Sequence, residues 1–167
     1  PVYAIEIENS VHSGCHVMLD ELEAISFFGP GSTFCTSEPN STGSPSHIFG
    51  EGSTSVANND LVLRADNVPP GQPGIFYYGP LETSQPFGNG IRCIALAGPG
   101  TVVRLFPFDT ADSTGLMSHA LDVANPPSLV GQIDPGETWK FQAWFRDPAA
   151  GGAGFDLSDG LSVTFTP

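Results

Sequence analysis

Short segments in which apolar and polar residues alternate recur along this chain, and Gly, Pro, Asn or Asp residues separate them. Such alternation is typical of antiparallel strands joined by turns, because successive side chains of a strand point to opposite faces. We expect strands at residues 2–7, 61–65, 75–78, 91–96, 102–106, 117–123, 138–145 and 161–165. Helical periodicity is nearly absent, so the chain is predicted to be all-β.

The segment 138–145 illustrates the two faces of such a strand. One face is predicted to carry Trp139, Phe141, Ala143 and Phe145, and the other Lys140, Gln142 and Trp144. Turn residues such as Pro69-Pro70-Gly71 and Asp134-Pro135-Gly136 lie between the expected strands. Nothing supplies the crossover helices that parallel strands need. We therefore predict an antiparallel β-sandwich of jelly-roll or Ig-like type.

The N-terminal part follows a different pattern. Four apolar residues lie at helical spacing among acidic ones: Met18, Leu19, Leu22 and Ile25. A short helix there would end near residues 29–31, where Gly and Pro follow one another. At 167 residues the chain has the length of one ordinary domain. We predict an extension of a strand and a short helix at residues 1–34, and a disulfide-bonded sandwich at residues 35–167.

The charge balance excludes several kinds of partner. The chain carries 18 acidic and five basic side chains, a formal net charge of −13, and its only lysine is Lys140. Nucleic acids and anionic lipid surfaces are bound through clustered Lys and Arg, so we expect neither as a partner. No apolar run approaches the roughly 20 residues that span a bilayer. Membrane insertion is therefore not expected.

The cysteine count points to an oxidising compartment. Cys15, Cys35 and Cys93 are three, so one disulfide would leave one thiol over. An odd cysteine in a secreted chain is typical of intermolecular pairing or of a free thiol. Disulfides persist in oxidising compartments, which predicts an extracellular or cell-surface location.

Five stretches from Cys35 onward carry a family resemblance. They are CTSEPNSTG (35–43), VANNDL (56–61), PFGNGIRC (86–93), PGETWKFQAWFRDP (135–148) and FDLSDGLSVTF (155–165). Together they resemble an uncharacterised module at the C-terminal ends of secreted and surface proteins of planctomycete-like and myxobacteria-like bacteria. The resemblance covers residues 35–167. It implies an extracellular β-domain in which Cys35 pairs with Cys93, and it carries no catalytic activity.

The first 34 residues hold the best concentration of transition-metal ligands: His12, Cys15 and His16. On a helix the two histidines would share one face, as zinc or copper ligands do. The Cys15-His16 pair also matches the end of a c-type haem attachment motif, although the position of its other cysteine is occupied by His12. The alternative is surface histidines beside a cysteine. A thiol nucleophile is not expected, because adjacent side chains point apart.

Asp147, Asp156 and Asp159 lie among several glycines in a carboxylate-rich segment. Carboxylate and carbonyl oxygens are the ligands that calcium prefers, so these residues are a candidate calcium site. Their spacing does not match an EF-hand. The alternative is ordinary turn chemistry, since Asp and Gly are both common turn residues.

The motifs of common hydrolases and nucleotide-binding proteins do not occur in the sequence. We therefore expect no enzyme, but a bacterial extracellular structural or adhesive domain that self-associates, in a surface filament for example, or joins other cell-surface proteins. The alternative is a binding module for polysaccharide or another surface ligand, with aromatic side chains stacked on the ligand. A metal- or haem-binding redox protein centred on residues 12–16 ranks third.

Overall fold

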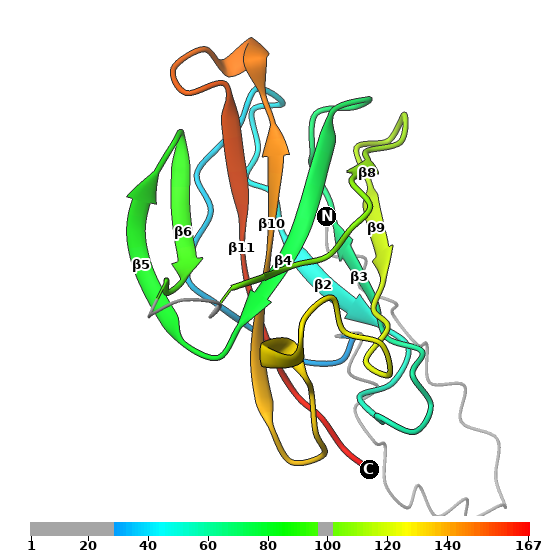
Figure 1. The fold of residues 1–167 in the computed structure, drawn as a ribbon. Helices are drawn as coiled ribbons and strands as arrows, with labels where there is room; N and C mark the ends of the chain where they lie inside the picture. Colours follow the sequence, from blue (N-terminus) through cyan, green and yellow to red (C-terminus); the bar gives the residue numbers. More distant parts are fainter. Residues whose placement is uncertain (1–28, 97–101) are drawn as a thin grey trace, which may run out of the picture.

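The computed structural model describes residues 29–96 and 102–167, and antiparallel strands dominate them (Figure 1). The largest sheet contains β1 (Ser32–Phe34), β4 (Pro73–Gly79), β7 (Val103–Arg104), β8 (Asp109–Thr110), β10 (Thr138–Arg146) and β11 (Phe155–Thr164). Its order is β1–β11–β10–β4–β7, and β8 pairs with the beginning of β4. The predicted all-β class is confirmed.

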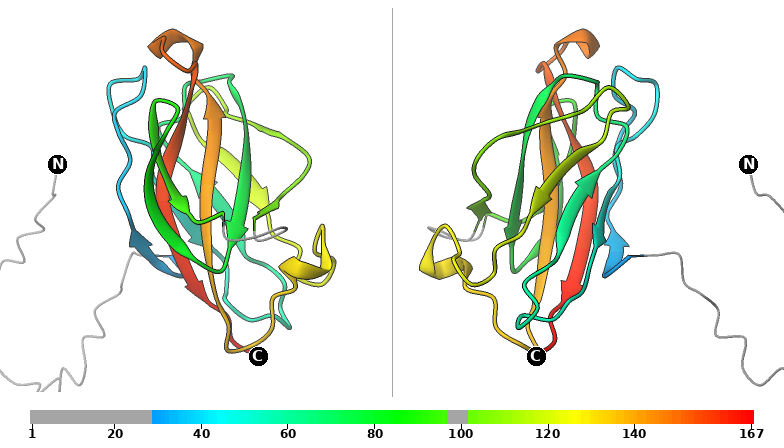
Figure 2. Two further views of the ribbon diagram at one scale, coloured as in Figure 1. Left: turned by 60° about the vertical axis from the view of Figure 1, so that its left-hand side comes forward. Right: turned by 90° about the vertical axis from the view of Figure 1, so that its right-hand side faces the viewer.

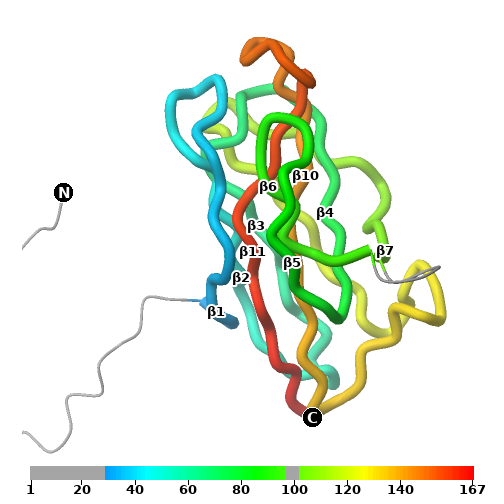
Figure 3. The backbone as a smooth tube through the Cα atoms, turned by 90° about the vertical axis from the view of Figure 1, so that its left-hand side faces the viewer, coloured from blue at the N-terminus to red at the C-terminus, as the bar shows by residue number. Residues whose placement is uncertain are grey.

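A second sheet and a hairpin lie on opposite faces of the six-stranded sheet (Figures 2 and 3). The second sheet contains β2 (Ile48–Glu51), β3 (Val62–Ala65) and β9 (Met117–Ala120), in the order β2–β3–β9. The hairpin contains β5 (Glu82–Phe87) and β6 (Gly90–Ile94). Two short 3-10 helices, η1 (Leu129–Gly131) and η2 (Pro148–Ala150), interrupt the connections before and after β10.

The main core lies between the six-stranded sheet and the three-stranded sheet. Strand β10 contributes the face predicted from the sequence: Trp139, Phe141, Ala143 and Phe145 are all buried there. The second sheet contributes Ile48, Leu63 and Met117 from the opposite side. Burying large apolar side chains from two facing sheets is the main stabilising contribution in a sandwich.

Strand β11 changes the face that it presents to the core part-way along. Gln142 pairs with Gly160 and Trp144 with Leu157, so two residues of β11 stand opposite the single residue Ala143. A bulge of this kind shifts the period-two alternation by one position. Leu161 therefore lies in the main core, whereas Leu157 lies on the outer face of the sheet. The sequence prediction found only the second half of β11, at 161–165, because this break hides the first half.

The β5–β6 hairpin covers part of the outer face and forms a second, smaller core with it. Tyr77, Ile94 and Leu157 are its buried members. The hairpin lies close to β11 at Gly90. A side chain at this position would place its Cβ atom 2.2 Å from Asp156 Oδ1. Only glycine fits this approach. Lys140 in β10 also forms an ion pair of 2.5 Å with Glu82 in β5.

Each strand expected within the described residues overlaps an observed one, whereas strand 2–7 and the helix near residues 18–25 lie outside them. Strands β1, β2, β5 and β8 were missed. Strand β5 is mostly exposed and polar, and the others are only two to four residues long. Strand β1 pairs with β11, and the ring of Phe34 packs on Gly160. The sheet therefore begins at Ser32, inside the segment that was assigned to the N-terminal extension.

Candidate ligand-binding site

A cavity of about 310 Å³ lies on the outer face of the six-stranded sheet, beside the β5–β6 hairpin. Four aromatic side chains line it: Tyr77, Phe87, Phe108 and Trp144. Four aliphatic side chains add to the lining: Ile75, Leu96, Val102 and Leu157. Two arginines, Arg92 and Arg104, complete the lining among the described residues. The wall is therefore apolar over most of its area and cationic at two places.

Alternation along the strands explains the floor of this cavity. Ile75 and Tyr77 in β4 and Trp144 in β10 point away from the main core, because their sequence neighbours point into it. Leu157 joins them because the bulge in β11 shifts its alternation. The hairpin supplies Phe87 and Arg92 as a wall. The bulge and the hairpin together create the cavity.

The rim of the cavity carries exposed apolar side chains. Phe87 is 44% exposed, Leu96 60% and Phe108 59%. Phe108 also contacts Phe106 edge-to-face, with ring centroids 5.6 Å apart. Single exposed apolar residues are ordinary, but several around one cavity indicate a surface that binds something.

Arg92 and Arg104 are two of the five basic residues of the chain. The guanidinium carbon of Arg92 lies 5.7 Å from the centroid of the Phe87 ring, within cation–π distance. The Nε atom of Arg92 is buried and has no hydrogen-bond partner among the described residues. Among the described residues, ion pairs hold Arg64 and Lys140 but neither arginine of the cavity. The cavity thus brings together two positive charges that form no ion pair with the described part of this strongly acidic chain.

Gln142 fixes the hairpin to the floor of the cavity. Its side chain is fully buried on the outer face of β10. Its Oε1 accepts hydrogen bonds from the Tyr77 hydroxyl and, at 2.9 Å, from the Cys93 amide. Its Nε2 donates to the carbonyl oxygens of Ile91, at 2.8 Å, and Ser158, at 2.7 Å. One side chain therefore connects β4, β6, β10 and β11.

The Tyr77 hydroxyl is the titratable group in the floor of the cavity among the described residues. Burial raises the pKa of Tyr77, while the charges of Arg92 and Arg104 act in the opposite direction. The phenol therefore stays neutral, and its proton is already donated to Gln142. The described lining contains no carboxylate, imidazole, thiol or aliphatic hydroxyl. A general base or nucleophile has no counterpart among these residues.

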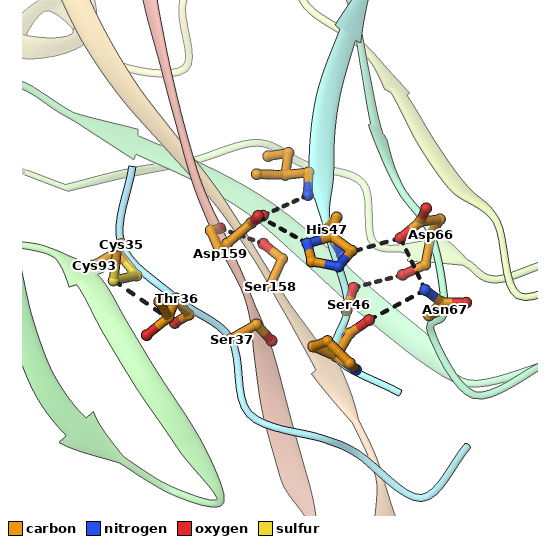
Figure 4. A network of polar contacts seen from close by, with 12 residues as sticks. Cys35, Thr36, Ser37, Ser46, His47, Asp66, Asn67, Cys93, Ser158 and Asp159 are labelled. Carbon is orange, nitrogen blue, oxygen red and sulfur yellow. Dashed lines mark hydrogen bonds and ion pairs between the residues drawn. A yellow bond between two sulfur atoms is a disulfide. The ribbon is translucent and has the colours of Figure 1, made fainter. Parts of the chain in front are cut away.

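The structure joins Cys35 and Cys93 by a disulfide, with 6.0 Å between their Cα atoms. This is the pair that the family resemblance implied. The bond connects Cys35, directly after the edge strand β1, to Cys93 in β6, so it joins the hairpin to the edge of the six-stranded sheet (Figure 4). The predicted metal ligands His12, Cys15 and His16 lie outside the described residues.

The three aspartates of the predicted calcium site do not form one group. Asp147 accepts hydrogen bonds from the backbone amides of Ser41 and Ala150. Asp159 instead accepts from His47 Nδ1 at 2.9 Å and from the Ile48 amide at 2.7 Å, across the sandwich (Figure 4). In residues 29–96 and 102–167, no three or more His, Cys, Asp or Glu side chains are arranged to hold a metal ion.

The His47–Asp159 pair connects the start of β2 to β11, and the nearby Ser46 and Ser158 hydroxyls donate to other groups. Ser46 Oγ donates to the Asp66 carbonyl oxygen at 2.6 Å, and Ser158 Oγ donates to the Asp159 carbonyl oxygen at 2.7 Å. Burial raises the pKa of Asp159, and its hydrogen bonds to His47 and Ile48 oppose that shift. These contacts join an exposed histidine in the loop before β2 to a buried carboxylate of β11, and they connect the two sheets.

The buried carboxylate of Asp156 lowers the stability of the folded protein at neutral pH. Burial, together with the charges of Asp147 and Glu38, raises its pKa to about 6, although its bond from the Leu157 amide acts the other way. Its Oδ2 atom is buried and has no hydrogen-bond partner in the described part of the chain. The folded protein therefore takes up a proton below about pH 6, before the unfolded chain does. Stability from this group rises as the pH falls from about 6 to about 4.

Asp156→Asn is accordingly expected to raise the free energy of unfolding by about 1–2 kcal/mol at neutral pH. The amide keeps the acceptor for Leu157 and removes the buried charge. Urea unfolding from pH 7 down to about 4 checks this result. The gain should vanish at the acidic end, and a gain that is constant with pH would show that the carboxylate charge is not its cause.

Sequence reasoning missed the arginines of the cavity and the role of Gln142. Arg92 and Arg104 stand inside the apolar strands predicted at 91–96 and 102–106. Arg64 and Lys140 also stand inside predicted strands, so four of the five cations do, and the sequence had no signal that singled out Arg92 and Arg104. Gln142 was assigned to the correct face, but its four partners come from segments as far as 65 residues away in the chain.

Comparisons with known proteins add no relative. No protein-family model, curated protein or solved structure matches the chain. In the part of the chain that the structure describes, no helix is long and apolar enough to cross a membrane.

Proposed function

We propose that this domain is a non-enzymatic extracellular binding module, which takes up a compact apolar ligand in the cavity beside the β5–β6 hairpin. The observation that carries the proposal is an aromatic cavity of about 310 Å³ with an exposed apolar rim and no reactive group in its described lining. Ligand pockets begin at roughly this volume, and an apolar cavity of roughly 150 Å³ already binds benzene. The space suits a body of one or two rings.

The lining favours an apolar ligand over a polysaccharide. Sugar hydroxyls need several hydrogen-bond partners when they are buried. The described polar groups at the cavity are two guanidinium groups, the Trp144 indole N–H and a Tyr77 hydroxyl that is already bonded to Gln142. The guanidinium and indole groups only donate hydrogen bonds, so they cannot accept from sugar hydroxyls. The disulfide supports an oxidising setting. There the module would serve adhesion to, or capture of, apolar compounds at a bacterial surface.

The two tryptophans of the chain provide a matched test. Trp144 lines the cavity, whereas Trp139 lies on the opposite face of β10 in the main core. Bromonaphthamide is an uncharged two-ring compound whose bromine quenches tryptophan fluorescence at contact. Trp139→Phe leaves Trp144 as the reporter, and we expect saturable quenching in this variant. Trp144→Phe leaves Trp139, and we expect no saturable quenching.

Equal saturable quenching in both variants, or none in either, would contradict the proposal. Far-UV circular dichroism of both variants verifies that each is folded. Equilibrium dialysis of bromonaphthamide against the unsubstituted protein should give one binding site per chain.

A further inference from the structure

We infer that the ligand of the cavity is an aromatic carboxylate, whose rings occupy the apolar space and whose carboxylate is bound by Arg92 and Arg104. This inference rests on the proposed function and specifies its ligand. It starts from the charge distribution. The chain carries 18 acidic side chains and only five basic ones, and two of the five line one apolar cavity.

Arg92 is the more informative of the two arginines. Its guanidinium carbon lies 5.7 Å from the centroid of the Phe87 ring, and its Nε atom is buried with no hydrogen-bond partner in residues 29–96 and 102–167. A buried N–H of a charged group that lacks a partner is costly, so native proteins seldom retain one without a use. Two other cations form ion pairs: Arg64 Nε lies 2.8 Å from Glu51, and Lys140 lies 2.5 Å from Glu82. Among the described residues the exposed Arg146 forms none. An anion bound in the cavity would satisfy Arg92.

Arg104 approaches the same space from a different element. Arg92 belongs to the hairpin and Arg104 to β7, which pairs with β4 at Tyr77. The charges of both arginines act on the Tyr77 hydroxyl in the floor of the cavity. The planar guanidinium fork matches a carboxylate in two parallel hydrogen bonds. Two such groups around one cavity suit one carboxylate better than a neutral ligand.

The body of the ligand follows from the remaining lining. Four aromatic rings line a space about twice that of an apolar cavity that binds benzene. Aromatic rings pack against one another in offset or edge-to-face arrangements, and Arg stacks on ring faces. A flat aromatic body is therefore favoured over a flexible alkyl chain, which would also lose conformational freedom on binding.

The net charge of the chain does not prevent this recognition. Repulsion between the acidic surface and an anion is screened over about 10 Å at moderate salt. Arg92 is half-buried and Arg104 exposed, and both border the apolar lining, so each can form a charge-assisted hydrogen bond with a ligand at contact distance. We expect the local attraction to exceed the screened repulsion.

The test compares bromonaphthoate with bromonaphthamide, which has nearly the same shape and no charge. Binding is measured by quenching of Trp144 in the Trp139→Phe variant at neutral pH. We expect the acid to bind roughly tenfold or more tightly than the amide. Arg92→Met and Arg104→Met should each reduce this preference, and the double variant should remove it. Arg146→Met is the matched control, because Arg146 is exposed and is not among the described lining residues.

The outcomes distinguish the carboxylate inference from the proposed function. If acid and amide bind equally well, the carboxylate inference is wrong while the binding module stands. If the preference for the acid survives the double arginine variant, the assignment to Arg92 and Arg104 is wrong. If neither compound binds, both the inference and the proposed function fail. Arg92→Lys keeps the positive charge but loses the planar guanidinium group. This variant should therefore retain part of the preference for the acid over the amide.

Discussion

Gln142→Leu is expected to lower the free energy of unfolding by about 3–5 kcal/mol, although leucine has a suitable size and is apolar. The change leaves the Tyr77 hydroxyl, the Cys93 amide and the carbonyl oxygens of Ile91 and Ser158 without their partner. Each buried polar group left unsatisfied costs about 1–3 kcal/mol, and water reaching part of the network reduces the sum. Urea unfolding followed by circular dichroism measures the loss.

Gln85→Leu is the control for this substitution, because Gln85 lies exposed on β5 and should change stability by less than about 0.5 kcal/mol. The Gln142 variant should also lose ligand binding, since β6 is then no longer held against the floor of the cavity. A decrease in the free energy of unfolding of less than about 1 kcal/mol would mean that the four groups find other partners. Gln142 would then not be what holds the hairpin to the sheet.

Removing the disulfide is the second change with a large expected effect. Cys35 and Cys93 are 58 residues apart, and closing a loop of that length is worth about 4 kcal/mol in the chain-entropy model. Cys35→Ala combined with Cys93→Ala should therefore lower the free energy of unfolding by about that amount. The measurement is best made with Cys15→Ser in both proteins, so that no other thiol interferes.

The same double variant also tests how the hairpin is held. The disulfide fixes β6 to the end of β1, and Gln142 fixes it to β10. With the disulfide removed, bromonaphthamide should bind more weakly even where the protein is still folded. Stability that does not change in the double variant, or in reductant, would show that the hairpin does not depend on the bond.

Patterning predicted those parts of the fold in which alternation is unbroken. In β10, Trp139 and Phe141 lie in the main core and Trp144 on the outer face, as the period of two requires. The first half of β11 was not predictable in this way. Its bulge at Ser158 and Asp159 places polar residues in the interior and moves Leu157 to the other face. The alternation of apolar and polar residues does not by itself reveal where a bulge shifts the period.

The site was less predictable than the fold, because it is built from contacts between distant segments. Arg92 and Phe87 reach the cavity only because a disulfide and Gln142 hold the hairpin over β4, β10 and β11. Two of the aspartates predicted as calcium ligands instead accept hydrogen bonds from backbone amides. Asp159 connects the two sheets through Ile48, and Asp147 caps η2 at the Ala150 amide. Buried carboxylates in β-proteins can serve the backbone rather than a metal.

Amide chemical shifts test directly whether a ligand binds in the cavity beside the β5–β6 hairpin. In a titration of the isotope-labelled protein with bromonaphthamide, the largest shifts are expected at Ile75 and Tyr77 in β4, Arg92 in β6 and Trp144 in β10. The strands β2, β3 and β9, on the far side of the main core, should change little. Shifts concentrated on those three strands, or no saturable shift at all, would contradict the account.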